Sequence, residues 1–192
     1  MRQSSIVRNT LETKIALSLN IDGSGKRDIS TGIGFFDHML ELLAVHAGFD
    51  LTVKCDGDIK VDGHHSVEDI GISLGKCIAE ALGDKRGIER YGNMFLPMDQ
   101  CLAQCTLDVS GRPYLVFNAD LSGKAGDFDM ELVEEFFRAV AYNAGLTLHL
   151  NLIYGANNHH VAEALFKAFA RAMRQAVKVT GTEVPSSKGM LE

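Results

Sequence analysis

The chain has 192 residues, of which 46% are hydrophobic and 23% are charged, as is ordinary for a folded water-soluble domain with one sizeable core or two small ones. The net charge of −6 argues against nucleic acid or an anionic membrane surface as the main partner. No apolar run approaches the ~20 residues of a membrane span, and Met1–Thr10 lacks the apolar core of a signal peptide. We therefore expect a cytoplasmic location.

The first half of the chain predicts a series of strands and helices that are separated by turn-forming residues. In chain order these elements are a strand at Lys14–Ile21, a strand at Asp28–Ile33, a helix at Phe36–Ala47, a strand at Phe49–Cys55 and a long helix that begins at His64.

The second half predicts the same elements in the same order. They are a strand at Cys101–Val109, a strand at Pro113–Asn118, a helix at Met130–Ala144, a strand at Leu146–Ile153 and a long helix that begins at His159. This succession predicts an α+β fold with antiparallel-type sheets on one side and helices on the other.

The correspondence between the halves indicates a tandem duplication of a half-domain. Ala47-Gly48 reappears as Ala144-Gly145, and in each case the glycine is expected to cap the end of a helix. The repeat unit is about 90 residues long, with a junction near Gly83–Asn93. We expect a first half-repeat at 1–92 and a second at 93–192, folded together as one compact unit.

The pattern His-His-x-x-Glu occurs once in each half, at 64–68 and at 159–163. Glu68 lies four residues after His64, so on a helix both side chains share one face and can hold one divalent metal. His65 is turned by about 100° from His64 and should point toward a different ion. The alternative is that each pair merely caps a helix, which two copies with glutamate at one offset make less attractive.

Two such motifs facing each other would hold two metals, each bound by the clamp of one motif and by the lone histidine of the other. The sequence does not say whether the facing motif belongs to the same chain. The metal ligands expected from the motifs are His64, His65, Glu68, His159, His160 and Glu163.

Aligning the halves pairs further polar residues. His38 falls opposite Glu135, which places one potential metal ligand opposite another, and Glu12 falls opposite Asp99. Lys167 lies one helical turn after Glu163, so its ammonium group should reach the neighbourhood of the metal.

Several basic residues stand at turns, where they could bind an anion. They are Arg90, Arg112 and Lys188, the last within the tail segment Pro185-Ser186-Ser187-Lys188-Gly189. A glycine-containing segment with serine hydroxyls and a lysine is a candidate anion clamp or lid, although a chain end of this composition can also be plainly disordered. Together with a dinuclear metal site, these residues suggest a phosphorylated substrate.

Five segments in this order resemble the imidazoleglycerol-phosphate dehydratase family of histidine biosynthesis over nearly the whole chain. They are Gly32-Ile33-Gly34-Phe35-Phe36-Asp37-His38-Met39, Asp62-Gly63-His64-His65-Ser66-Val67-Glu68-Asp69, Leu107-Asp108-Val109-Ser110-Gly111-Arg112-Pro113-Tyr114, Asn158-His159-His160 through Glu163 to Phe166-Lys167-Ala168, and Pro185-Ser186-Ser187-Lys188-Gly189. The length leaves no room for the phosphatase domain fused to some members, so the monofunctional form is expected.

The resemblance implies a fold in which two sheets flank four helices, like ribosomal protein S5 domain 2, and a homo-oligomer of 24 subunits with active sites at subunit interfaces. It implies two Mn²⁺ per active site, held by His38, His64, His65, Glu68, Glu135, His159, His160 and Glu163. It also implies that Glu12 and Asp99 are acid/base carboxylates, and that the phosphate is bound by Arg90, Arg112, Lys167, Ser186 and Lys188.

The implied reaction removes water from D-erythro-imidazoleglycerol phosphate and gives imidazole acetol phosphate. Two metals on the ring nitrogens would hold the imidazole as an imidazolate, because coordination lowers the pKa of a ligand. The electron-rich ring would expel the hydroxyl from the attached carbon, and a carboxylate would remove the proton from the next carbon. The resulting enol would tautomerise to the ketone.

Two rival functions use the same ligands. A dinuclear metallohydrolase acting on a phosphate ester would release free phosphate, which a dehydratase does not. A metal-storage protein would leave Arg90, Arg112 and the tail segment without a role, and ferritin-like proteins carry Glu-x-x-His on four long helices, the reverse order.

Overall fold

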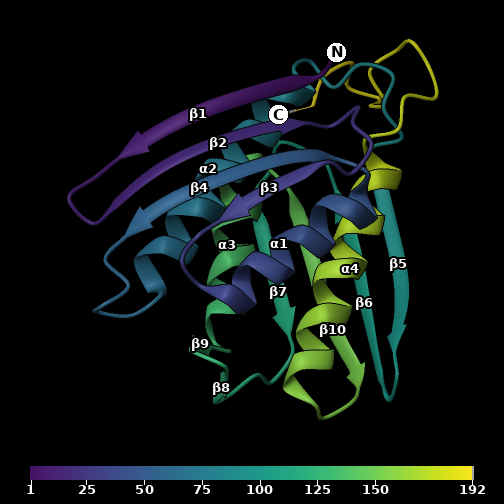
Figure 1. Cartoon of the computed structure of the whole chain (residues 1–192). Coiled ribbons are helices and arrows are strands. Elements are labelled where there is room, and N and C mark those ends of the chain that lie inside the picture. The colour runs from purple at the N-terminus through teal and green to yellow at the C-terminus, as the bar shows by residue number, and fades with distance from the viewer. Residues whose placement is uncertain (192) are drawn as a thin grey trace.

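The computed structural model describes residues 1–191 as two four-stranded sheets with four helices between them (Figure 1). The first half contains β1 (Gln3–Asn9), β2 (Thr13–Asn20), β3 (Arg27–Ser30), α1 (Gly34–Ala47), β4 (Asp50–Gly57) and α2 (His64–Leu82). The second half contains β5 (Tyr91–Met98), β6 (Cys101–Asp108), β7 (Tyr114–Asn118), β8 (Lys124–Ala125), β9 (Phe128–Asp129), α3 (Leu132–Ala144), β10 (Thr147–Tyr154) and α4 (Asn158–Ala176).

The two sheets have the same topology, which confirms the expected α+β fold built from a duplicated half-domain. Their strand orders are β1-β2-β4-β3 and β5-β6-β10-β7. Gly48 and Gly145 follow α1 and α3 in the left-handed conformation, with φ of 74° and 66°, and act as the predicted C-terminal caps. The boundary between residues 92 and 93 stays a prediction.

The sheets are mixed rather than purely antiparallel, which corrects one detail of the expectation. β3 pairs with β4 in parallel, and β7 pairs with β10 in parallel. The reason is that α1 and α3 each connect two strands of one sheet by a crossover, which leaves the two strands pointing the same way.

The first strand of each sheet and the small β8–β9 hairpin were not predicted. β1 reads QSSIVRN and β5 reads YGNMFLPM, and both are edge strands. Burial alternates along both strands, but residue type does not follow it: inward positions hold Ser4 and Arg8 in β1 and Gly92 in β5, and an outward position of β5 holds Phe95.

The helices form a layer whose interior is almost entirely apolar. α2 packs on α3 and on the first sheet, and α4 packs on α1 and on the second sheet. Cys77, Cys101 and Cys105 are buried free thiols in this core. Among residues 1–191, no helix is both long and apolar enough to cross a bilayer.

Two glycines on α2 permit its close approach to α3. A Cβ atom added at Gly71 would lie 2.8 Å from Ala139 Cβ and 2.9 Å from Phe136 O, and one added at Gly75 would lie 2.8 Å from Val140 O. The two helix backbones are therefore nearer than any side chain at these positions would allow.

We predict that Gly71→Ala destabilises the protein, although alanine is the better helix former by about 1 kcal/mol. The added methyl group meets backbone and Cβ atoms that cannot move aside, so the expected loss of unfolding free energy is roughly 1–3 kcal/mol. Gly34→Ala at the start of α1 is the control, since its Cβ would meet nothing within 4 Å. Urea unfolding at one fixed protein concentration measures both variants, and equal stabilities would contradict the close-packing argument.

Candidate metal and anion sites

One cluster of metal-binding side chains joins the two halves of the chain. His38 of α1, His159 of α4 and Glu163 of α4 offer ligand atoms that all lie within 4.8 Å of one another. His38 Nε2 and His159 Nε2 lie 3.0 Å and 3.1 Å from the same oxygen, Glu163 Oε1. The predicted clamp of His159 with Glu163 is therefore present, but within this chain its third member is His38 rather than a lone histidine of the facing motif.

The other oxygen of Glu163 is bound by Lys167. The distance from Lys167 Nζ to Glu163 Oε2 is 2.5 Å, and both side chains are largely removed from solvent. Burial alone would raise the pKa of Glu163, but the hydrogen bonds from Lys167, His38 and His159 outweigh it and lower that pKa to about 2. The carboxylate is thus ionised across the physiological range.

This cluster fits a divalent metal on its own geometry. Each imidazole nitrogen lies about 3 Å from the same carboxylate oxygen, and the three atoms all lie within 4.8 Å of one another, so small side-chain movements would bring them to the roughly 2.1 Å distances of metal ligands. Both histidines direct Nε2 toward Glu163 Oε1, whereas Lys167 contacts the other carboxylate oxygen. A mixed nitrogen and oxygen donor set of this kind suits borderline divalent ions such as Mn²⁺.

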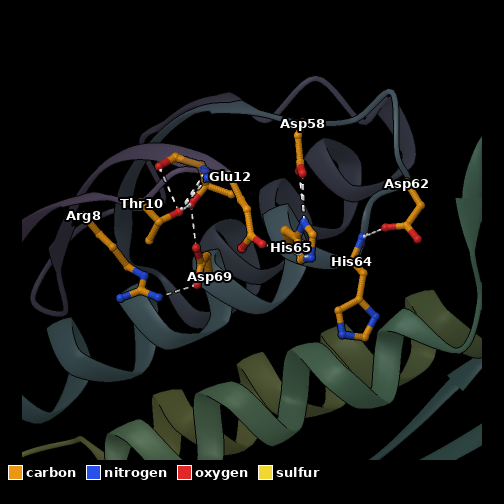
Figure 2. A network of polar contacts seen from close by, with 9 residues as sticks. Arg8, Thr10, Glu12, Asp58, Asp62, His64, His65 and Asp69 are labelled. Atoms are coloured by element: carbon orange, nitrogen blue, oxygen red, sulfur yellow. Dashed lines mark hydrogen bonds and ion pairs between the residues drawn. The ribbon is translucent and has the colours of Figure 1, made fainter.

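The second histidine of the first motif meets the acid/base candidate Glu12 (Figure 2). His65 Nε2 lies 3.6 Å from Glu12 Oε1, while His65 Nδ1 is 3.0 Å from Asp58 Oδ2. The hydrogen bond with Asp58 raises the pKa of His65 and fixes its ring orientation. The backbone N–H of Asp58 also donates to the carbonyl oxygen of Glu12 at 3.0 Å. Asp58 thus contacts both His65 and Glu12.

The second motif repeats this arrangement with different chemistry. His160 Nε2 lies 3.7 Å from Asp99 Oδ2, and His160 Nδ1 is 2.9 Å from Gln100 Oε1. Asp99 therefore lies beside the second histidine of its motif, as Glu12 lies beside His65. The strand register nevertheless corrects the alignment by one residue, since Glu12 directly precedes β2 as Gln100 directly precedes β6.

Three further expected ligands, His64, Glu68 and Glu135, do not form a cluster within this chain. His64 and Glu68 are exposed at the start of α2. Glu135, on the first turn of α3, has Arg138 as its neighbour, with Arg138 Nε 3.6 Å from Glu135 Oε2. Among residues 1–191, only His38, His159 and Glu163 form a group of three possible ligands.

Four of the five expected phosphate-binding residues line one pocket of about 550 Å³. These residues are Arg90, Arg112, Ser186 and Lys188. Asp108 Oδ1 and Oδ2 accept two hydrogen bonds from Arg90, at 2.7 Å and 3.0 Å, which orient its guanidinium group. The fifth residue, Lys167, lies outside this pocket and is bound to Glu163 instead.

The anion pocket and the metal cluster lie at opposite ends of α4. The backbone N–H of Arg90 donates to Ala176 O at the last residue of the helix, while Glu163 lies near its start. More than three helical turns separate Glu163 from Ala176, which is about 20 Å along the axis. One small molecule cannot reach both places in the same chain.

Several contributors to these sites carried no signal in the sequence. Asp58, Gln100 and Asp108 orient His65, His160 and Arg90 respectively. Each is an isolated polar residue in a loop or at a strand end. Their contacts are made with residues distant in the sequence and become visible only in the folded structure.

Comparison with known proteins gives a consistent result. The family described as imidazoleglycerol-phosphate dehydratase matches residues 31–173. The chain belongs to the imidazoleglycerol-phosphate dehydratase family. It is 59% identical over 198 aligned positions to the imidazoleglycerol-phosphate dehydratase of Lactococcus lactis subsp. lactis (strain IL1403), covering 99% of each chain.

Solved structures of the imidazoleglycerol-phosphate dehydratase family share the fold. The enzyme from Staphylococcus aureus subsp. aureus N315 superposes with a TM-score of 0.85 at 47% identity, over 93% of this chain and 99% of that one. The Pyrococcus furiosus protein, solved in complex with (S)-C348, also gives a TM-score of 0.85 at 34% identity, over 97% of this chain and 100% of that one. The family match spans the metal cluster, both arginines and Lys167.

We predict that ionised Glu163 stabilises the metal-free fold in a pH-dependent way. Its pKa of about 2 lies below the usual glutamate value of 4.5, so on acidification the unfolded chain takes up the proton first. The stabilisation is fully present above about pH 4.5 and is lost as the pH falls toward about 2. The stability difference between the original protein and Glu163→Gln, measured by urea unfolding after chelation, should shrink over this range.

Glu134→Gln is the control for this comparison, because Glu134 pairs with Arg138 on the exposed face of α3. Its effect on stability should be small at every pH. A Glu163→Gln difference that stayed constant between pH 6 and pH 3 would contradict the assignment.

Proposed function

We propose that this chain is an imidazoleglycerol-phosphate dehydratase, a carbon–oxygen lyase of histidine biosynthesis in the cytoplasm. It eliminates water from D-erythro-imidazoleglycerol phosphate and yields imidazole acetol phosphate. The observation that carries the proposal is the coexistence, in a member of the family, of a histidine–carboxylate metal cluster, a carboxylate beside a motif histidine and a separate anion pocket.

The proposed cofactor is two Mn²⁺ per active site. The residues that would hold them are His38, His64, His65, Glu68, Glu135, His159, His160 and Glu163. When bound, the metals would supply Lewis acidity that stabilises negative charge on the imidazole ring of the substrate.

Glu12 is proposed as the base that removes the proton from the carbon next to the one that loses hydroxide. Its carboxylate is exposed and lies beside His65 Nε2, so it reaches the space in front of the motif. Asp99 stands in the corresponding space before His160 and is proposed as the second acid/base group. Loss of hydroxide from one carbon and of a proton from the next balances as one water and leaves an enol, which becomes the ketone.

Arg90, Arg112, Ser186 and Lys188 are proposed to bind the phosphate. Arg90 is held by Asp108, whereas Arg112 lies 3.8 Å from Asp108 and keeps an exposed guanidinium group free for an oxyanion. Lys167 is proposed as a further phosphate ligand, which requires its ammonium group to leave Glu163. Binding of a metal by Glu163 would weaken that ion pair and favour the move.

The proposed assembly is a homo-oligomer of 24 subunits with active sites shared between chains. The separation of about 20 Å between metal cluster and anion pocket along α4 supports it, because a single chain cannot offer both to one substrate. The incomplete grouping of His64, Glu68 and Glu135 supports the same arrangement, since a neighbouring chain would supply the missing ligands.

Mass analysis of substrate after incubation with metal-stripped protein, with and without Mn²⁺, tests the activity. Loss of one water with phosphate retained, only when metal is present, is expected. Glu12→Gln should bind Mn²⁺ and substrate nearly normally, while kcat falls by about 100-fold or more, as for loss of a general base. Release of free phosphate would assign the protein to the metallohydrolases, and tight Mn²⁺ uptake without any product would indicate storage.

Mixing two inactive variants tests the shared sites. Glu163→Gln damages the metal cluster and Arg112→Ala damages the anion pocket, so each alone should be inactive. Co-expressed chains should regain activity, approaching about a quarter of the sites when subunits assemble at random and each site combines two chains. Mixing Glu163→Gln with His159→Ala is the control, since both changes damage the same cluster. No recovery in the first mixture would contradict sites shared between chains.

A further inference from the structure

A chain of hydrogen bonds runs from the buried end of Arg8 to the turn that carries Glu12 (Figure 2). Asp69, on α2, is only 6% exposed. Its Oδ1 accepts from Arg8 Nη2 at 2.7 Å, and its Oδ2 accepts from Thr13 Oγ1 at 2.5 Å. Thr13 Oγ1 lies 3.2 Å from Thr10 Oγ1, which accepts the backbone N–H of Glu12 at 3.1 Å.

The charge of Asp69 fixes the direction of this chain. A hydroxyl group has one proton, and Thr13 gives its proton to the carboxylate, so the bond between the two threonines must use the proton of Thr10. The oxygen of Thr10 is then free to accept the N–H groups of Glu12 and Thr13, at 3.1 Å and 2.9 Å. An acceptor at position 69 thus holds Thr13 as a donor to the carboxylate and leaves the Thr10 oxygen to accept both N–H groups.

The second half of the molecule shows that the fold does not require this network. Each hairpin has a two-residue turn, Leu11-Glu12 between Thr10 and Thr13, and Asp99-Gln100 between Met98 and Cys101. Counting outward from the turns, and from the two motifs, gives three matched pairs: Arg8 with Leu96, Thr13 with Cys101, and Asp69 with Ala164.

In the second half all three positions are apolar. Cys101 and Ala164 are 1% and 0% exposed, and Leu96 packs against the core. The corresponding hairpin, β5–β6, therefore packs on the corresponding helix, α4, with apolar residues at all three of these positions. In the first half, by contrast, Arg8 Nε is buried without an acceptor among the described residues, which is unfavourable for stability. A costly polar network that the fold can replace by apolar packing points to a role other than stability.

We propose that Asp69, through Thr13 and Thr10, is a positioning residue that holds the Glu12 turn so that the carboxylate faces His65. The inference rests on the proposed dehydratase activity. Glu12 has an exposed side chain on a short turn, and its backbone is secured on one side by Thr10 and on the other by Asp58. Loss of the Thr10 contact would free the turn on the side nearest β1, and a displacement of about 1 Å can slow a reaction by about 100-fold.

The test compares steady-state kinetics of three variants with the original protein, together with Mn²⁺ content. Asp69→Asn keeps the shape but presents N–H groups where an acceptor is needed, so kcat should fall by about 10- to 100-fold while KM changes little. Thr13→Val should behave in the same way, and Thr13→Ser, which keeps the hydroxyl, should retain turnover. Mn²⁺ content should stay unchanged in all three.

Two further readouts separate positioning from stability. With substrate deuterated at the carbon that loses its proton, the isotope effect on kcat should increase in Asp69→Asn, because proton removal becomes rate-limiting. The triple variant Arg8→Leu, Thr13→Cys, Asp69→Ala copies the residues of the second half, so it should fold with unimpaired thermal stability and still lose turnover.

Asp22→Asn is the matched control. Asp22 accepts from Arg2 at the other end of the same hairpin, so its loss removes a comparable ion pair far from Glu12 and should leave kcat unchanged. An active original protein with undiminished kcat in Asp69→Asn and in the triple variant would overturn the inference. An inactive original protein would instead refute the proposed function.

Discussion

The burial of four helices between two sheets is the constraint on which the rest of the molecule depends. With both flanks of the layer covered, most positions along the helices are apolar, and the potential metal ligands lie near the starts of the helices. The potential ligands obey this rule in every helix: His38, His64, Glu135 and His159 each lie within the first two turns. The placement of the potential metal ligands thus follows from how the two sheets cover the helices.

Much of this could be read from the sequence because duplication doubles every signal. The repeated His-His-x-x-Glu pattern fixed the starts of α2 and α4, and the pairing of Ala47-Gly48 with Ala144-Gly145 fixed the ends of α1 and α3. Periodicity then located the central strands of both sheets. What these features have in common is that local spacing and burial determine them.

Features that depend on long-range packing could not be read in this way. β1 and β5 were missed because residue type does not follow the alternation of burial along them: inward positions hold Arg8 and Gly92, and an outward position holds Phe95. His38 was expected to bind a metal, but its partnership with the clamp of α4 depends on how α1 crosses that helix. The alignment of Glu12 with Gln100 rather than Asp99 required the strand register, because spacing alone tolerates a shift of one residue.

The separation of metal cluster and anion pocket along α4 has a thermodynamic consequence for the proposed assembly. A substrate that contacts two chains at once binds only the assembled form, so its binding free energy also stabilises the association of the subunits. By linkage, whatever factor the substrate adds to subunit affinity, assembly adds to substrate affinity. The affinity of an inhibitor for the site would then fall as the protein is diluted and the particle dissociates. A tightly binding ligand of this site would, in turn, stabilise the particle against dissociation.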